Sequence, residues 1–366
     1  MIHRIGSLLI VFLLYFSYSF SQEIKGKFIA SNDMHLSYMG RVGFTDSCAE
    51  IYWTGTSVTI NVTNTKSAKA LLSDDKGNNY YYVIIDGNGN DAIKIKINKE
   101  KRLYDLATNL SDGKHTIQLF KVTNTDFITT HFFGFELDAT AKVLMVNKLP
   151  KRKIEFFGNS ITCGHGAENN SNNSGDPEFF NNYRAYGAIT ARHFNAQYHC
   201  TAKSGIGITV SWFPEVMPDI YDRLNPSDPN SKWDFEKYAP DIVVINLFQN
   251  DSWIVNMPAN AQFKAKFGTT KPSEEFIISA YKNFLQSIRS KYPNAQIICC
   301  LGDMDATKEG SKWPRYINTA VTTFNDKKMI THFFPYKGTS GHPIIKDHEV
   351  MANDLITFIK KMGFWK

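Results

Sequence analysis

The sequence predicts two domains of different class, an all-β sandwich followed by a three-layer α/β domain with a parallel sheet. Short strand-like runs separated by turn signals occupy residues 22–148. A basic, proline-bearing stretch at residues 149–153 ends that pattern. From there to the last residue, continuous apolar runs alternate with helical segments, as is typical of parallel strands buried on both faces. We therefore place the two domains at residues 22–148 and 149–366.

Residues 1–21 are predicted to be a signal peptide. Arg4 supplies a positive charge, an apolar core of secretory length follows, and Ser19-Phe20-Ser21 has the small-x-small form of a cleavage site. A membrane anchor is the alternative, but the apolar run is short for a span. We expect an exported protein, secreted or periplasmic, without a membrane span in the mature chain.

The first domain shows strand patterning broken by tight turns. Asp86-Gly87 and Asp112-Gly113 are turn pairs, because glycine adopts a positive φ at little cost. The length and spacing of the apolar runs indicate a β-sandwich. Strands are expected at 51–53, 58–62, 80–85, 93–97 and 115–120.

The second domain alternates strands and helices. Ser273 can cap a helix that runs to about residue 292, with Glu274 and Glu275 in its first turn, where the helix dipole favours acids. A last helix is expected from about residue 348. Strands are expected at 154–158, 197–202, 241–247, 296–301 and 329–334.

Composition excludes several classes of function. Hydrophobic residues make up 43% and charged residues 21% of the chain, which is an ordinary globular composition. The net charge of +6 is dispersed, without the basic run that nucleic-acid binding would require. The five cysteines form neither a disulfide framework nor a metal-binding spacing, and we expect buried free thiols. No metal and no cofactor are predicted.

Polar residues follow four of the predicted strands. In open α/β sheets, ligands bind at the carboxyl ends of the strands. The residues in question are Ser160 in Gly-Asn-Ser, Gly205 in Ser-Gly-Ile-Gly, the pair Asn250-Asp251, and His342 before Pro343. Each signal alone is weak, because serines more often cap helices and single histidines are more often structural.

Together, and in this order, the four segments resemble the four-block signature of the SGNH hydrolase superfamily over about residues 150–366. The preceding sandwich and the runs at 153–162 and 183–189 extend the likeness. They resemble carbohydrate esterase family 2, whose acetyl xylan esterase-like members pair a jelly-roll domain with a flavodoxin-like SGNH domain. That resemblance covers nearly the full mature length.

The resemblance implies roles for the four segments. Ser160 would be the nucleophile, and His342 would accept its proton and later return it to the departing sugar hydroxyl. The oxyanion hole would consist of the backbone N–H groups of Ser160 and Gly205 with the side chain of Asn250.

Two positions depart from the family pattern. Asn159 stands where the first block usually carries an acid, and we expect little loss from this change. Many members also place an aspartate two or three residues before the histidine, where this chain has Ser340 and Thr339. The resemblance therefore implies a Ser-His dyad, with a main-chain carbonyl that orients the ring and either hydroxyl as a possible helper.

Three further residues are candidate substrate contacts: Trp253, Asp251 and Trp212. An indole can stack on a sugar ring, although core packing is the alternative for both tryptophans. His165 is expected to shape the loop behind Ser160.

The function that the resemblance implies is removal of O-acetyl groups from plant-type polysaccharides or oligosaccharides. Xylan and glucomannan are the expected substrates, with 6-O-acetyl groups among the candidate positions. The alternatives are a non-catalytic glycan-binding protein with an inert SGNH domain, and an SGNH lipase or thioesterase. A monomer is expected, and the sequence leaves open whether the sandwich binds glycan.

Overall fold

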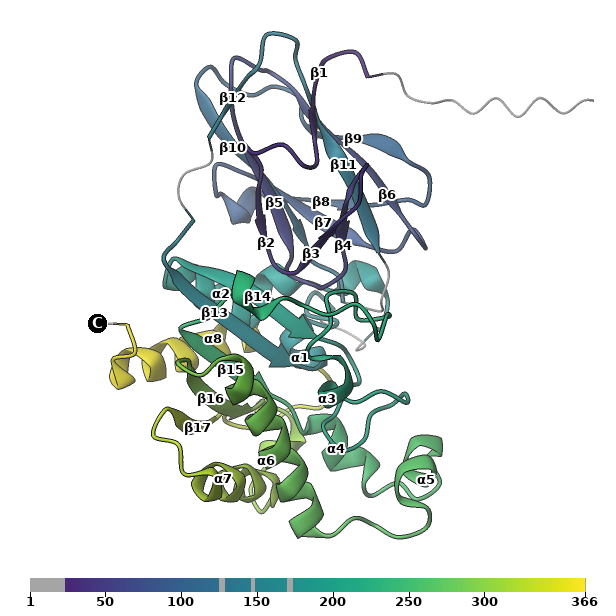
Figure 1. Cartoon of the computed structure of the whole chain (residues 1–366), viewed down its shortest axis with the longest axis vertical. Helices are drawn as coiled ribbons and strands as arrows, with labels where there is room; N and C mark the ends of the chain where they lie inside the picture. The colour runs from purple at the N-terminus through teal and green to yellow at the C-terminus, as the bar shows by residue number, and fades with distance from the viewer. Residues whose placement is uncertain (1–23, 125–128, 146–148, 170–173, 366) are drawn as a thin grey trace, which may run out of the picture.

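The computed structural model describes residues 24–124, 129–145, 149–169 and 174–365 (Figure 1). The predicted signal peptide at residues 1–21 lies outside this part. Among the helices of the described residues, none has both the length and the apolar character needed to span a membrane.

Two antiparallel sheets form the first domain and enclose a shared apolar core. One sheet has the order β3-β4-β11-β6-β9, with β1 beside β11, and the other has the order β12-β5-β10-β7-β8, with β2 beside β5. The predicted all-β class is therefore confirmed. The strands are β1 (Lys27–Ala30), β2 (Ser37–Met39), β3 (Val42–Phe44), β4 (Ala49–Ile51), β5 (Ser57–Thr63), β6 (Ala68–Asp74), β7 (Tyr80–Ile85), β8 (Ile93–Lys96), β9 (Arg102–Ala107), β10 (Lys114–Lys121), β11 (Thr130–Leu137) and β12 (Lys142–Leu144).

The predicted strand at 51–53 is wrong for two of its three residues. Strand β4 ends at Ile51, and Tyr52 and Trp53 instead join the apolar core of the second domain. Their apolar character reflects contact between the domains rather than a place in the sandwich. The other four predicted strands coincide with β5, β7, β8 and β10 within about a residue.

A five-stranded parallel sheet forms the centre of the second domain, in the order β14-β13-β15-β16-β17. This order is the flavodoxin-like 2-1-3-4-5 arrangement, whose ligands bind at the carboxyl ends of the strands. All five strands lie where the apolar runs predicted them. They are β13 (Arg152–Gly158), β14 (Ala196–Ala202), β15 (Ile242–Asn246), β16 (Gln296–Leu301) and β17 (Met329–Phe333).

Helices cover both faces of this sheet, which confirms the three-layer prediction. Helices α2 (Tyr186–His193) and α8 (Ile345–Met362) contribute to the core on one face, and α6 (Glu274–Lys291) and α7 (Trp313–Phe324) to the core on the other. The shorter elements are α1 (Ser160–Cys163), α3 (Met217–Ile220), α4 (Gln249–Ile254), α5 (Ala261–Phe267), and the 3-10 turns η1 (Gly89–Asp91), η2 (Pro177–Phe179), η3 (Asn182–Arg184), η4 (Phe235–Lys237) and η5 (Asp305–Thr307).

The two long helices that the sequence predicted are both present. Ser273 caps α6 as expected, because its hydroxyl accepts the backbone N–H of Phe276 at 3.2 Å. The last helix begins at Ile345, three residues before the predicted start. The carboxylate of Asp347 accepts the backbone N–H of Ile344 at 3.0 Å and so caps the helix earlier.

A buried ion pair joins the two domains where the sandwich packs on β13 and β14 (Figure 1). Arg41, between β2 and β3, donates to Glu155 of β13 at 2.9 Å, and both side chains are almost fully buried. Trp53 adds a hydrogen bond from its indole to the carbonyl of Leu224 at 2.8 Å. The predicted boundary after residue 148 falls between the end of β12 and the start of β13.

All five cysteines are buried and free, as predicted. Four of them lie in the second domain, at β14, β16 and α1. Burial raises the pKa of the Cys200 thiol to about 12, so that this sulfur stays protonated and unreactive at neutral pH.

Candidate active site

Ser160 is presented by a sharp turn at the carboxyl end of β13. It is the first residue of α1, and the preceding Asn159 caps that helix by accepting the backbone N–H of Ile161 at 3.1 Å. Gly158 has no substitute at this turn, because a Cβ there would lie 2.0 Å from the hydroxyl oxygen of Thr162. The short polar side chain of Asn159 thus shapes the turn that places the serine at the cavity wall.

His342 lies beside Ser160 although 182 residues separate them in the chain. It belongs to the loop between β17 and α8, and its Nε2 is 2.9 Å from the Ser160 hydroxyl oxygen. Burial, with smaller contributions from His165, His348 and Lys337, lowers the pKa of His342 from 6.5 to about 3. The imidazole is therefore neutral at physiological pH, as a general base must be.

The two predicted helpers of His342 both contact Lys337. The Lys337 ammonium donates to the Thr339 hydroxyl at 2.6 Å and to the Ser340 carbonyl at 3.1 Å. Both residues are exposed. The main-chain carbonyl expected behind the His342 ring stays a prediction.

The three predicted oxyanion donors lie around one cavity. Gly205 has φ +79°, and a Cβ there would press on Trp212 and Phe213, so a glycine is required. Asn250 uses one amide hydrogen on the carbonyl of Ile206 at 2.8 Å. Its amide oxygen accepts the indole N–H of Trp212 at 3.0 Å, which fixes the orientation of the amide. The second amide hydrogen of Asn250 remains available for a ligand.

The cavity has a volume of about 440 Å³ and lies at the carboxyl ends of the strands. Six of its lining residues were predicted as site residues: Ser160, Gly205, Trp212, Asn250, Trp253 and His342. Trp212 is 44% exposed, and the Trp253 indole donates to Asp305 at 2.7 Å. Both tryptophans therefore have polar anchors and present aromatic surface to the cavity. Their contact with substrate stays a prediction.

The predicted substrate contact of Asp251 is wrong. Its side chain is fully buried, and its carboxylate accepts the backbone N–H groups of Ile208, Thr209 and Val210 and the hydroxyl of Thr209. Burial raises the pKa of Asp251, while these hydrogen bonds act against that effect. Asp251 points into the loop behind the site because that loop offers unpaired donors that only an acceptor can satisfy.

Sequence reasoning missed three residues of the cavity wall: Lys203, Ser204 and Phe213. His165, which was expected only to shape the loop behind Ser160, also lines the wall. The His165 ring stacks between those of Phe180 and His342, with centroid distances of 4.4 and 4.5 Å, and its Nδ1 lies 3.1 Å from the Ser204 hydroxyl. Lys203 and Ser204 directly precede Gly205, so the strand-end rule that selected Gly205 could have included them. No sequence signal predicted the stacking of two distant histidines.

The sandwich also supports this site. Asn124 accepts the backbone N–H of Ser204 at 3.3 Å, and Tyr82 donates to Glu168 at 2.9 Å. Lys94 forms an ion pair with the same glutamate at 2.5 Å. Through Glu168, the sandwich holds the segment that follows His165.

Two family models match the chain. The carbohydrate esterase 2 N-terminal family matches residues 38–146, and the GDSL-like lipase/acylhydrolase family matches residues 156–328. The two matches fall on the sandwich and on the α/β domain.

Relatives of the full chain are found among curated proteins and solved structures. A cellulase/esterase CelE of Acetivibrio thermocellus is 34% identical over 90% of this chain, which spans only 39% of that protein. An acetylxylan esterase / glucomannan deacetylase of Cellvibrio japonicus is 28% identical, over 82% of this chain and 83% of that protein. The structure of a family two carbohydrate esterase from Clostridium thermocellum in complex with cellohexaose is 33% identical, with a TM-score of 0.79, over 90% of this chain and 99% of that one.

Proposed function

The chain belongs to carbohydrate esterase family 2, and on this basis we propose that it is a serine esterase that removes O-acetyl groups from polysaccharides or oligosaccharides. One observation carries the proposal. The imidazole Nε2 of His342 and the hydroxyl of Ser160 lie 2.9 Å apart in a cavity that also contains Gly205 and Asn250.

The geometry suits acyl transfer in two steps. The Ser160 oxygen attacks the carbonyl carbon of the acetyl ester while the neutral His342 takes the hydroxyl proton. The resulting oxyanion receives hydrogen bonds from the backbone N–H groups of Ser160 and Gly205 and from the free amide hydrogen of Asn250. His342 then gives its proton to the departing sugar oxygen, which leaves an acetylated serine.

Water completes the cycle. His342 takes a proton from the water, whose oxygen attacks the acetyl-serine carbonyl, and acetate leaves as the proton returns to the Ser160 oxygen. No carboxylate is invoked in this scheme, which is therefore a Ser-His dyad. The charge that develops on His342 is transient, because the proton passes on to the sugar oxygen or returns to the Ser160 oxygen.

Acetylated xylan and glucomannan are the substrates that we propose, because the relative from Cellvibrio japonicus is named an acetylxylan esterase / glucomannan deacetylase. Trp212 and Trp253 offer aromatic surface beside the nucleophile for sugar rings. We also propose export of the protein, on the charge and apolar pattern of residues 1–21.

Acetate release tests the proposal. We expect wild-type protein to release acetate from acetylated xylan or glucomannan, and Ser160→Ala and His342→Ala each to lower kcat by at least about a thousandfold. Ser290→Ala, which alters an exposed serine of α6, is the matched control and should retain full activity.

Two results would contradict the proposal. Equal rates for wild type and Ser160→Ala would favour a non-catalytic glycan-binding protein. Preference for long-chain over acetyl nitrophenyl esters would favour a lipase instead.

A further inference from the structure

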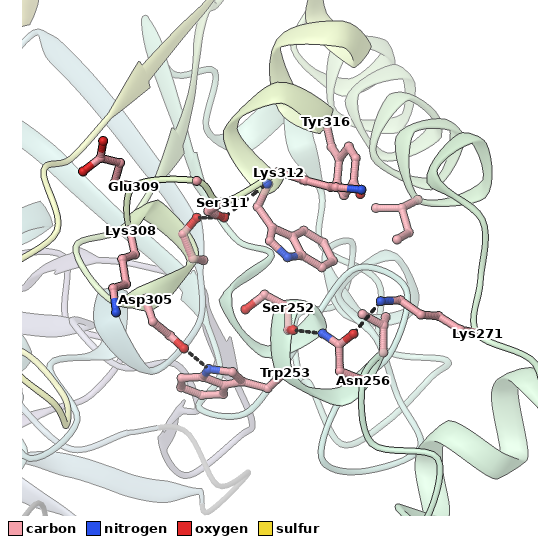
Figure 2. Close-up of a pocket in the computed structure, with 15 residues that line it drawn as sticks. Ser252, Trp253, Asn256, Lys271, Asp305, Lys308, Glu309, Ser311, Lys312 and Tyr316 are labelled. Carbon is pink, nitrogen blue, oxygen red and sulfur yellow. Dashed lines mark hydrogen bonds between the residues drawn. The ribbon is translucent and has the colours of Figure 1, made fainter.

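A second pocket adjoins the candidate catalytic cavity, and the two share Trp253 (Figure 2). Its volume is about 420 Å³. It is formed by α4, the segment before α6, the loop after β16 and the start of α7. None of the dyad or oxyanion residues lines it. A ligand in this pocket would therefore contact Trp253, which is also part of the wall of the catalytic cavity.

Hydrogen bonds hold that shared wall in place. The Trp253 indole donates to one carboxylate oxygen of Asp305 at 2.7 Å, as Figure 2 shows. The other oxygen of Asp305 accepts from Gln249 at 2.7 Å. Both oxygens of this acid are thus engaged, and Trp253 is fixed as a surface between the pockets. Trp313 adds a second aromatic side chain, with its ring centroid 5.0 Å from that of Phe248.

A chain of hydrogen bonds directs Lys271 toward the pocket (Figure 2). Asn256 donates to the carbonyl of Ser252 at 2.8 Å, and its amide oxygen accepts from the Lys271 ammonium at 2.5 Å. An ammonium has three hydrogens to donate, so two remain for another acceptor. Asn256 is neutral and leaves the charge of Lys271 uncompensated.

The charges of the pocket leave a place for an anion. Lys312 is paired with Glu274 at 2.9 Å. Lys271 and Lys308 have no carboxylate within ion-pairing distance in the part of the chain that the structure describes. Glu309 is exposed, and its carboxylate points away from Trp253 in Figure 2. Two lysine side chains without a carboxylate partner among the described residues therefore line the pocket. The oxygens of Asp305 are hydrogen-bonded by two neutral groups, the Trp253 indole and the Gln249 amide, so that this exposed acid pairs with neither lysine.

We propose that the second pocket binds a sugar unit that carries a carboxylate, a uronic acid, in the same glycan whose acetyl ester lies in the catalytic cavity. Aromatic walls suit the apolar face of a sugar ring, and Lys271 supplies charge-assisted hydrogen bonds to the carboxylate. The inference rests on the proposed function and specifies its substrate as an acidic, branched or mixed glycan. Trp253, as the common wall, would contact the sugar units in both pockets.

Binding without turnover tests this assignment. The probes are an unacetylated xylose oligomer with one glucuronic acid substituent and the same oligomer without it, titrated calorimetrically into the Ser160→Ala protein at low salt. We expect the acidic oligomer to bind about tenfold more tightly, and Lys271→Gln to abolish that advantage without weakening the neutral oligomer. Lys264→Gln, an equal charge change on α5 outside the pocket, should leave the advantage intact.

The remaining outcomes overturn the inference. Three results would contradict the proposed carboxylate site. They are equal binding of both oligomers, no binding of either, and identical behaviour of the Lys271 and Lys264 variants. Acetate release by wild type from a neutral acetylated oligomer is measured in parallel. Binding of the acidic oligomer without esterase activity would refute the proposed function alone, and esterase activity without selective binding would refute this inference alone.

Discussion

Neutrality of His342 is a property of its surroundings rather than of its type. An ordinary imidazole titrates near pH 6.5, within the physiological range. Here the ring lies between Ser160 and the stacked His165, and burial lowers the pKa of both imidazoles, to about 3 for His342 and about 4 for His165. The cavity thus favours the form of His342 that accepts a proton.

We expect the pH dependence of acetate release to reflect this shift. Because a lowered pKa keeps His342 neutral at pH values well below 6.5, kcat/KM should stay level from pH 8 to about 5 and fall only as the pH approaches about 3. Initial rates over this range, with folding checked by circular dichroism at each pH, provide the measurement. An acid limb centred near pH 6.5 would show that the cavity does not perturb this histidine.

At the scale of elements, the loop after β14 depends on one acid from the next strand–helix unit. Asp251 of α4 satisfies three successive backbone N–H groups in residues 208–210. The same loop supplies the Ile206 carbonyl and the Trp212 indole, which together orient Asn250. A buried structural acid therefore supports the oxyanion hole without lining the cavity.

Substitution of this acid should cost both stability and activity. Asp251→Ala leaves several buried donors unpaired, and we expect the free energy of unfolding to drop by roughly 2–4 kcal/mol. Asp251→Asn keeps one acceptor oxygen and should lose less. Urea denaturation gives the stability, and acetate release by the folded fraction gives a lowered kcat.

Asp105→Ala is the reference for this experiment, since that aspartate is 68% exposed on the sandwich. If Asp251→Ala unfolds at the same urea concentration as Asp105→Ala, the loop does not depend on this carboxylate.

At the scale of the whole molecule, a buried ion pair between Arg41 and Glu155 joins the sandwich to the α/β domain. Glu155 accepts from Arg41 of the sandwich, and also from Thr201 at 2.8 Å and from Tyr292. Arg41 donates further to the carbonyls of Tyr221 and Arg223 at 2.7 and 2.8 Å. Removal of the sandwich would leave Glu155 without its counter-charge in the interior, which is costly.

We therefore expect Arg41→Ala to lower the free energy of unfolding by about 3–5 kcal/mol, measured by urea denaturation of the full chain. Arg102→Ala, which changes an exposed arginine of β9, should cost far less. In the double variant with Glu155→Gln, the loss should be less than additive, because both changes remove one interaction. Additive losses would indicate that the two groups are energetically independent.

Much of the second domain follows from the sequence because local patterns determine it. Continuous apolar runs marked all five parallel strands, and the hydroxyl of Ser273 marked the start of α6. Seven strands of the sandwich were not predicted, because four of them have only three or four residues and the other three carry mixed polar patterns. They are β1, β2, β3 and β12, and β6, β9 and β11. Tyr52 and Trp53 were misassigned because they pack on the neighbouring domain.

The candidate site, too, was predicted in part from local sequence and in part determined by the tertiary structure. By itself, the sequence determined which residues follow each parallel strand. Because the carboxyl ends of such strands meet at one edge of the sheet, this was enough to predict Ser160, Gly205, Asn250 and His342 as site residues. Only the tertiary structure decided where each side chain points. It turned Asp251 away from the cavity, stacked His165 on His342 and placed Trp253 between two pockets. Those outcomes depend on hydrogen bonds and ring contacts between distant segments, which no local pattern specifies.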